Sequence, residues 1–182
     1  MAISLGNLAI VSAVEHPELV ADPVMKSLLL LPGAEAIGVA EIDPALSDTA
    51  AFCAEYAVRP EQAANCIILE TKTATGSAFA ACLVLGSTKA DVNGVACRTL
   101  GVKKASFAPM EQAVAQTAME PGAITPIGLP SDWPILIDKA VADSNLLIIG
   151  SGIRKSKLVV PGSFFATIPN VQIVEGLGKI IS

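Results

Sequence analysis

Short apolar runs alternate with breaks that contain Gly, Pro or Asp along most of the chain. Runs rich in Val, Ile and Leu and bounded by turn residues are typical of buried strands. One pair, residues 66–70 and 79–85, is separated by a Thr-Ala-Thr-Gly-Ser segment and predicts two neighbouring strands joined by a turn. The other predicted strands are residues 36–42, 135–137, 146–149, 158–160 and 171–174.

Apolar residues four apart, Val20, Val24 and Leu28, predict a helix that starts at His16-Pro17 and ends at Pro32-Gly33. Elsewhere, helix starts are predicted from capping residues and from Pro, which fits the first helical turn. These signals predict helices from Ser47 or Asp48 to Tyr56, from Pro60, from Asp91 to Gly101, from Pro109 to Ala118, over residues 139–142 and from Pro161.

Strands and helices follow one another without strict alternation, which favours an α+β fold over a doubly wound one. We expect a compact domain with a mixed, largely antiparallel β-sheet surrounded by helices. The length of 182 residues suggests one domain over residues 1–182. Within it, residues 1–33 form an N-terminal helical segment, and residues 34–182 form the main body.

Composition limits the partners of this domain. Charged residues make up only 16% of the chain, so we expect another subunit, as in a homo-oligomer, or another partner to cover part of the surface. The net charge of −5 argues against broad nucleic-acid binding, because long duplex contacts need many Lys and Arg residues. A contact limited to a few nucleotides remains compatible with this charge.

The cysteines and the N-terminus bear on location and metal binding. Cys53, Cys66, Cys82 and Cys97 have apolar neighbours and no C-x-x-C spacing, which predicts reduced core thiols and no metal site. No basic segment precedes the first apolar stretch, and no apolar run reaches the roughly 20 residues that span a bilayer. These features predict a cytoplasmic protein without a membrane segment.

Residues 120–130, reading E-P-G-A-I-T-P-I-G-L-P, hold three prolines and two glycines between apolar segments. Each Pro fixes φ and removes an N–H, whereas each Gly can adopt a positive φ. One interpretation is a stiff loop whose remaining amides can hold an oxyanion or a sugar hydroxyl. The alternative is a long surface connection without chemistry.

Three features in order carry a family resemblance: Gly122-Ala-Ile-Thr-Pro126 followed by Gly128, Asp138 closing the next strand, and the turn Gly150-Ser-Gly152. The chain resembles, from about Glu41 to its C-terminus, the YbaK-type aminoacyl-tRNA deacylases. This family includes the editing domain inserted in bacterial prolyl-tRNA synthetases. The resemblance implies the same compact architecture.

The resemblance also implies a site, with one departure. The family has a lysine just before the strand that begins here at Cys66, whereas this chain has Asn65. An ammonium can pair with a phosphate or polarise an ester carbonyl, but an amide can only form hydrogen bonds. Asn65 either positions the ribose or the carbonyl, or it is a strand-entry residue without a role. Lys72 is too far along the strand to replace the lysine.

The loop can act without that lysine, because backbone N–H groups stabilise the negative charge that ester hydrolysis places on the carbonyl oxygen. Gly122 and Thr125 are therefore expected to be catalytic with Asn65, Thr125 through its hydroxyl. For Asp138, a helix N-cap and a pocket residue are alternatives that one side chain can combine. The residues expected to bind substrate are Ala123, Ile124, Pro126, Gly128, Asp138, Gly150, Ser151 and Gly152.

Arg154, Lys155 and Lys157 follow the Gly turn and are candidates for tRNA phosphate contacts, with a solvated turn as the alternative. His16, the only histidine, lies in the N-terminal segment, and its expected place is a helix start at the surface rather than a general base. No protein nucleophile, metal or cofactor is needed, since water or a substrate group attacks in the family.

The leading hypothesis is a freestanding hydrolase that removes a small mischarged amino acid from the 3′ end of tRNA, with an aminoacyl-tRNA synthetase as a further partner. The first alternative is a catalytically silent module of the same fold that binds aminoacyl-tRNA or its 3′ end, because Asn65 replaces the family lysine. The second is an interaction protein unrelated to tRNA. The sequence does not identify the amino acid or the tRNA.

Overall fold

The computed structural model describes residues 4–181, which form an α+β fold with three β-sheets. A five-stranded sheet has the order β10-β7-β4-β3-β6, and a four-stranded sheet has the order β1-β2-β9-β8. The first sheet is mixed, since β7 pairs in parallel with β4 and β10. The second is antiparallel throughout. This arrangement confirms the predicted mixed, largely antiparallel class.

The elements have the following bounds. The strands are β1 (Ile10–Ser12), β2 (Gly38–Glu41), β3 (Ala64–Thr73), β4 (Gly76–Leu85), β5 (Thr88–Ala90), β6 (Ala105–Phe107), β7 (Ile135–Asp138), β8 (Leu147–Gly150), β9 (Ser156–Val160), β10 (Val171–Val174) and β11 (Gly178–Ile180). The helices are α1 (Asp22–Leu28), α2 (Thr49–Glu55), α3 (Cys97–Leu100), α4 (Met110–Thr117) and α5 (Lys139–Ala142).

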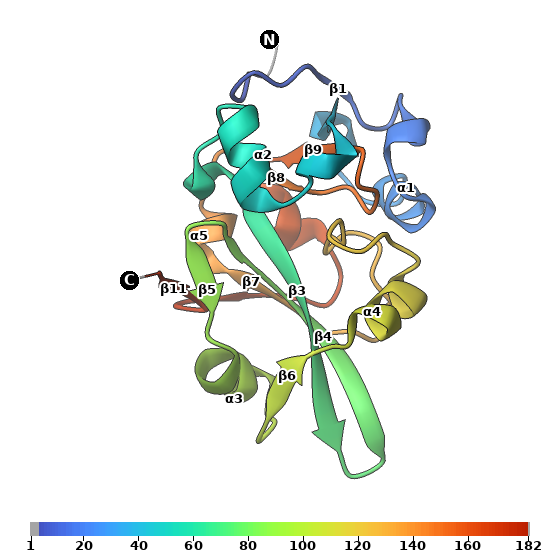
Figure 1. The fold of residues 1–182 in the computed structure, drawn as a ribbon. Helices are drawn as coiled ribbons and strands as arrows, with labels where there is room; N and C mark the ends of the chain where they lie inside the picture. Colours follow the sequence, from blue (N-terminus) through green and yellow to red (C-terminus); the bar gives the residue numbers. More distant parts are fainter. Residues whose placement is uncertain (1–3, 182) are drawn as a thin grey trace.

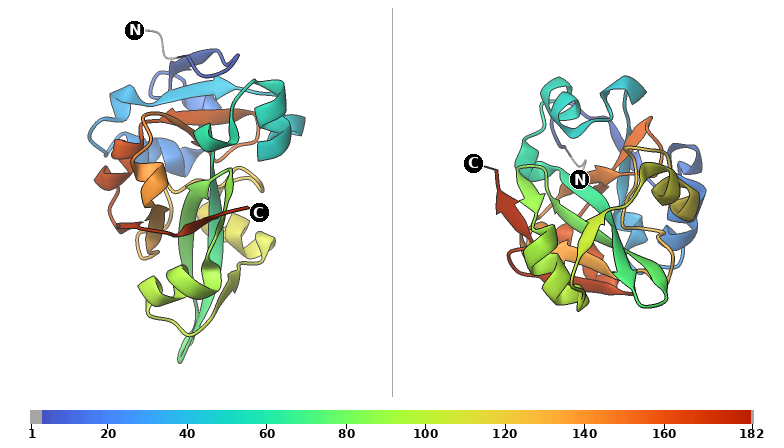
Figure 2. Two further views of the ribbon diagram at one scale, coloured as in Figure 1. Left: turned by 90° about the vertical axis from the view of Figure 1, so that its left-hand side faces the viewer. Right: turned by 60° about the horizontal axis from the view of Figure 1, so that its bottom comes forward.

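The four-stranded sheet lies at one end of the molecule, and the long β3–β4 hairpin extends from it to the other end (Figures 1 and 2). An isolated parallel bridge between Ala63 and Ile148 joins the start of β3 to β8. The main hydrophobic core lies between these elements and includes Leu83, Ile137 and Leu158, each fully buried. No helix within residues 4–181 is long and apolar enough to cross a bilayer.

The predicted N-terminal helix is shorter than its apolar spacing suggested. Residues Pro17–Leu19 form a 3-10 turn, and α1 begins only at Asp22. Pro23 fits the first turn of a helix but would break its interior, so the helix cannot run on from His16. The segment also contains a strand, β1, which was not predicted. Residues 1–3 of this segment lie outside the described residues.

Two other predicted helices, starting at Pro60 and Pro161, are 3-10 turns, Pro60–Gln62 and Gly162–Thr167. The short strands β5, β6 and β11 were also missed. The predicted helices from Asp48, Asp91 and Pro109 are confirmed. Asp48 caps α2, and a π-helical stretch, Val92–Ala96, follows Asp91 and leads into α3.

Candidate active site

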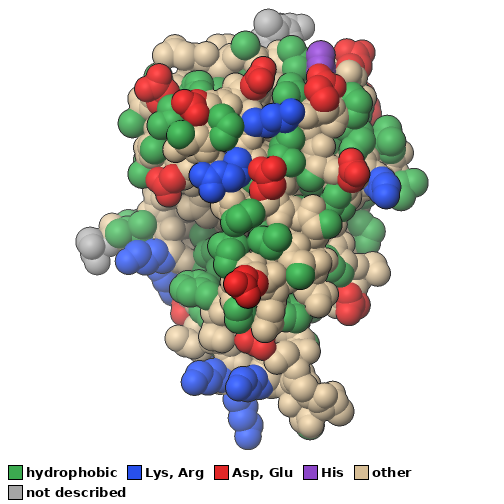
Figure 3. All heavy atoms as spheres, turned by 45° about the vertical axis from the view of Figure 1, so that its right-hand side comes forward, with side chains coloured by type: hydrophobic (Ala, Val, Ile, Leu, Met, Phe, Trp, Pro, Cys, Tyr) green, Lys and Arg blue, Asp and Glu red, His purple; other side chains and the backbone are tan. Residues whose placement is uncertain are grey.

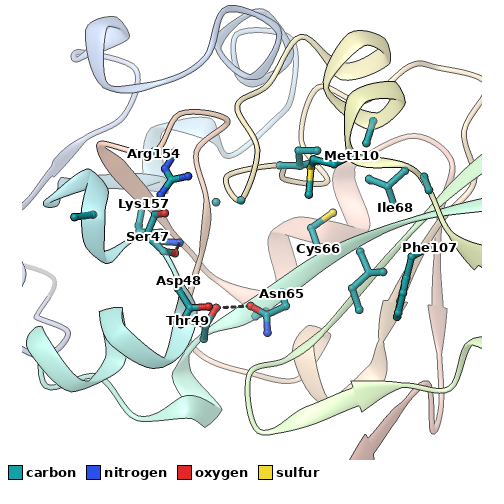
Figure 4. A pocket seen from close by; sticks show the side chains of 18 residues that line it. Ser47, Asp48, Thr49, Asn65, Cys66, Ile68, Phe107, Met110, Arg154 and Lys157 are labelled. Carbon is teal, nitrogen blue, oxygen red and sulfur yellow. Dashed lines mark hydrogen bonds between the residues drawn. The ribbon is translucent and has the colours of Figure 1, made fainter.

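A cavity of about 600 Å³ lies where the start of β3 meets the β8–β9 hairpin, the N-terminal end of α2 and the loop between α4 and β7. Arg154, Lys157 and Asp48 lie at one end of it, and Cys66 and Met110 lie towards the other end (Figure 4). A ligand with a charged group at one end and an apolar group at the other would match this lining.

Sheet register brings Asn65 and Lys157 to the same cavity. The bridge between Ala63 and Ile148 places Asn65 near Gly150, two residues further along each strand. Gly150 is in turn the antiparallel partner of Lys157 on β9. The start of β3 therefore meets the β8–β9 hairpin, which is distant from it in the sequence, and Asn65, Gly150 and Lys157 all line the cavity.

Asn65 is held in place by the first residue of α2. Thr49 Oγ1 donates a hydrogen bond to Asn65 Oδ1 over 2.6 Å, drawn as the dashed line in Figure 4. α2 itself begins at this point because the Asp48 carboxylate accepts from Ala50 N over 3.1 Å. Since the Thr49 hydroxyl occupies the side-chain oxygen, the Asn65 amide group is left as a donor for a ligand.

Lys157 is a buried cation at the polar end of the cavity. It is only 7% exposed, and its Nζ donates to the carbonyl oxygen of Ser47 over 2.8 Å. The same Nζ lies 5.5 Å from the centre of the Phe52 ring. Within residues 4–181 no carboxylate lies within ion-pair distance of it. Burial lowers the pKa of this ammonium, and attraction by Asp48 opposes that shift.

A buried ammonium without a carboxylate partner is costly, and an anionic ligand oxygen in the cavity would offset that cost. The sequence did place Lys157 among the candidate cations, but as a contact on an exposed turn. The signal for burial was its position inside the apolar strand that ends Leu158-Val-Val160.

The predicted rigid loop is present, and part of it lines the cavity. Gly122 adopts a φ of +79°, and both Gly122 and Ile124 contribute to the lining. The loop is fixed by backbone hydrogen bonds from Ala123 N to Glu120 O over 3.1 Å and from Gly152 N to Ala123 O over 2.8 Å. In the described chain the amides of Gly122 and Ile124 donate to no backbone carbonyl, whereas the amide of Ala123 does.

The second half of the loop supports the first half rather than lining the cavity. Thr125 and Pro126 are buried, and the Thr125 hydroxyl has no hydrogen-bond partner, alone in this respect among buried side-chain atoms of the described residues. Gly128 has a φ of +86°, and a Cβ at this position would collide with the backbone of Pro23. These three residues lie outside the cavity lining.

The turn Gly150-Ser-Gly152 holds the loop against the β8–β9 hairpin. A Cβ on Gly150 would come within 2.5 Å of the carbonyl oxygen of Ala123, so only Gly allows this approach. The hydroxyl of Ser151 is fully buried and lies 2.7 Å from that of Ser156. A Cβ on Gly152 would collide with Ala21. Of this turn, only Gly150 lines the cavity.

Asp138 occupies the N-cap position of α5, but its side chain caps no amide of that helix. The carboxylate instead accepts from Leu177 N over 3.2 Å, beside β11. Capping by this side chain was therefore a wrong prediction, because the chain segment before β11 supplies a competing donor. Asp138 is buried and lies outside the lining of the cavity.

The other two candidates for phosphate contacts, Arg154 and Lys155, differ in their positions. Arg154 lines the polar end of the cavity, where its guanidinium donates to Pro44 O over 3.3 Å and its amide to Glu120 over 2.5 Å. Lys155 is exposed and lines an adjoining groove that shares Arg154 with the cavity.

Cys66 is the one cysteine that lines the cavity. Burial raises the pKa of its thiol, so the group stays protonated near neutral pH. A protonated thiol is a poor nucleophile, and Cys66 therefore contributes apolar surface. All four cysteines are free, and Cys53, Cys82 and Cys97 are buried.

The part of the sequence that builds the cavity matches a known family of domains. The family model described as "Aminoacyl-tRNA editing domain" matches residues 43–166, the segment that builds this cavity. This chain belongs to the aminoacyl-tRNA editing domain family.

Solved structures show the same fold at low sequence identity. One, a proposed trans-editing enzyme for prolyl-tRNA synthetase, is 18% identical with a TM-score of 0.68, over 84% of this chain and 94% of that one. A scaffold protein used for epitope grafting is 17% identical with a TM-score of 0.69, over 85% of this chain and 96% of that one. No curated protein sequence matches the chain.

Proposed function

We propose that this protein hydrolyses the ester bond of a mischarged aminoacyl-tRNA. The observation that supports it best is the polar end of the cavity. The buried ammonium of Lys157 lies there in the same cavity as Asn65, Gly122 and Ile124. The amides of Gly122 and Ile124 make no backbone hydrogen bond. Such donors stabilise an oxygen that becomes negatively charged.

In the proposed reaction, a water molecule attacks the carbonyl carbon of the ester and gives up a proton, which a substrate hydroxyl can relay to the leaving ribose oxygen. The carbonyl oxygen becomes an oxyanion, which the Lys157 ammonium and the amides of Gly122 and Ile124 stabilise. The bond to the ribose oxygen of the terminal adenosine then breaks, and that oxygen takes up a proton. The products are a free amino acid and an uncharged tRNA 3′ end.

Asn65 and the remaining loop residues position the substrate. The Asn65 amide, oriented by Thr49, donates to the ribose or to the ester carbonyl. Ala123 and Gly150 keep the loop close to the β8–β9 hairpin, and Arg154 is proposed to contact the tRNA phosphate, with Lys155 beyond it.

The amino acid is proposed to be small, as the family resemblance implies, with its side chain towards the apolar end of the cavity. The similar trans-editing protein suggests a substrate mischarged by prolyl-tRNA synthetase. We also propose that the protein associates with itself, because the apolar side chains of Leu29 and Leu30 are 68% and 85% exposed. A strict monomer in sedimentation at high concentration would contradict this association.

The alternative, a module that binds aminoacyl-tRNA without hydrolysing it, rests on Asn65 in place of the family lysine. The substitution Asn65→Lys separates the two. If Lys157 already supplies the cation, Asn65→Lys should only alter the rate of a reaction that the wild-type protein performs. If the module is silent, the wild-type protein should bind a tRNA 3′ end without turnover.

The direct test is incubation of the purified protein with a panel of tRNAs, each charged with a defined amino acid. We expect release of a small amino acid from at least one mischarged tRNA. No release above background from any tRNA at high protein concentration would defeat the proposal.

A further inference from the structure

Three lysines gather at the end of the molecule that lies away from the four-stranded sheet. Lys72 is near the end of β3, and Lys103 and Lys104 lead into β6; all three are exposed. The last paired residues of these strands are Thr71 and Ala105, so Lys72 lies across from Lys104 one position further on. Lys and Arg side chains are seen together at the lower end in Figure 3. We call Lys72, Lys103 and Lys104 the tip cluster.

Two lysines of the tip cluster, Lys72 and Lys104, share a face of the sheet with the cavity. Side chains alternate between the faces of a strand, so Ile68 and Lys72 on β3 point to the same side. Ile68 lines the cavity, and so does Ala108, which continues β6 by donating its amide to Ile68 O. Four residues of extended chain separate Ile68 from Lys72, which is about 13 Å. One surface thus runs from the apolar end of the cavity to the lysines.

The fold does not neutralise these lysines. Like charges directly opposite one another on neighbouring strands destabilise a sheet. The chain has a second such pair, Lys89 and Lys179 across β5 and β11, but there Asp91 lies 3.7 Å from the ammonium of Lys179. Within residues 4–181 no ion pair forms to any lysine of the tip cluster. In a chain of net charge −5, this is a local excess of positive charge.

Two further side chains lie close to this surface. Phe107 on β6 is the partner of Leu69 and therefore points to the other face of the sheet, where it is 69% exposed and also lines the cavity. A nucleotide base could stack on its ring. Glu70 lies between Ile68 and Lys72 on the cavity face, and its carboxylate accepts from Ser77 Oγ over 2.6 Å. The negative charge of Glu70 is unfavourable for binding an anion on this surface.

We propose that the tip cluster binds the phosphate backbone of the tRNA acceptor end, whose terminal aminoacyl-adenosine enters the cavity. This inference rests on the proposed function, since it names the surface that carries the rest of the substrate. One strand of a nucleic-acid helix carries a phosphate about every 3.4 Å, so a 13 Å surface spans about four of them. Contacts with few phosphates also agree with an acidic chain.

The test is the affinity for an uncharged tRNA with an intact 3′ end, measured between about 50 and 200 mM salt. The triple variant Lys72→Met, Lys103→Met, Lys104→Met should bind about 10- to 100-fold more weakly at the low-salt end. Its plot of log affinity against log salt should be shallower by about 2 to 3. The matched control is Lys26→Met, Lys89→Met, Lys179→Met, which removes the same charge elsewhere and should change affinity by less than about threefold.

Two further variants sharpen the result. Glu70→Gln removes the unfavourable charge and should strengthen binding. The pair Arg154→Met, Lys155→Met tests the other cationic region: if it removes the whole salt dependence while the tip variant behaves like the control, the inference is overturned. All substituted lysines of the tip cluster are exposed, so the variants should fold, which thermal unfolding verifies.

A fragment substrate separates this inference from the proposed function. The tip variant should hydrolyse aminoacyl-adenosine, which lacks the phosphates, as fast as the wild-type protein does. If the wild-type protein hydrolyses no ester at all, the proposed function fails, while tRNA binding that depends on the tip cluster would still stand. If hydrolysis occurs and the tip variant binds tRNA normally, only this inference fails.

Discussion

Lys157 carries a charged ammonium, as surface residues do, but it is buried like a core residue. Its aliphatic part is buried, its Nζ donates to a carbonyl, and the Phe52 ring lies beside it. Replacement by Met would keep the length and the packing but remove the charge, so the fold should be as stable or slightly more stable. Removing one stabilising donor of an oxyanion costs about 100- to 1,000-fold in rate.

We therefore expect Lys157→Met to lower kcat for deacylation by about 100-fold or more without lowering Tm. Lys26→Met, an exposed lysine on α1, is the control and should leave both unchanged. A variant Lys157→Met with normal kcat would show that this ammonium does not act on the reacting ester.

The lowered pKa of Lys157 predicts opposite pH dependences of activity and stability. Folding disfavours the charged form of this lysine, so the unfolded chain binds more protons between the lowered pKa and the ordinary lysine value. Stability should therefore rise with pH through that window, whereas deacylation, corrected for spontaneous ester hydrolysis, should fall as the ammonium is lost. In Lys157→Met both changes should disappear. A rate that keeps rising through the window in the wild-type protein would contradict a charged Lys157 in the reaction.

At the same scale, the sequence identified Asn65 and Gly122 as members of one site, and both line the cavity. It could not show that Lys157 is buried, because the carbonyl that holds it belongs to Ser47, 110 residues earlier. Nor could it show that Thr125 and Asp138 lie outside the lining, since their surroundings are set by packing against distant segments.

In the loop between α4 and β7, each glycine is required for a different structural reason. Gly122 has a positive φ but open space around its Cα, and a Cβ added there would meet only Ser47 Oγ, at 4.0 Å. A side chain would therefore be strained rather than blocked, at a cost of about 1–2 kcal/mol. It would also place a methyl group at the cavity lining.

Gly101, which ends α3, provides a matched control because its φ is +68° and nothing lies within 4 Å of an added Cβ. Gly122→Ala and Gly101→Ala should lower the free energy of unfolding by similar amounts, about 1–2 kcal/mol. Only Gly122→Ala should also lower kcat/KM for deacylation, by about tenfold or more if the amide is displaced. Equal activities of the two variants would remove Gly122 from the site.

Sequence patterns predicted the longer elements well and the shorter ones poorly. The β3–β4 hairpin, α2, α4 and β10 were predicted because capping residues and apolar runs are local signals. The three-residue strands β1, β5, β6 and β11 were missed, because they are defined by pairing with distant strands rather than by their own pattern. The cavity depends on the junction of β3 with β8, which is likewise a long-range pairing.

At the scale of the whole molecule, the proposed function requires an acidic protein to recognise a polyanion through a restricted surface. Hydrolysis of full-length aminoacyl-tRNA should therefore depend on salt, with kcat/KM falling as salt rises with a log–log slope of about −2 to −3. Hydrolysis of aminoacyl-adenosine should hardly depend on salt, because it carries no phosphate. Equal slopes for the two substrates would mean that the phosphates outside the cavity are not bound.

The most direct measurement is single-turnover deacylation of a mischarged tRNA panel by three proteins side by side: wild type, Lys157→Met and Gly122→Ala. We predict that the wild-type protein releases a small amino acid and that both variants are slower while remaining folded. Release of no amino acid by the wild-type protein, or equal rates for all three, would contradict it.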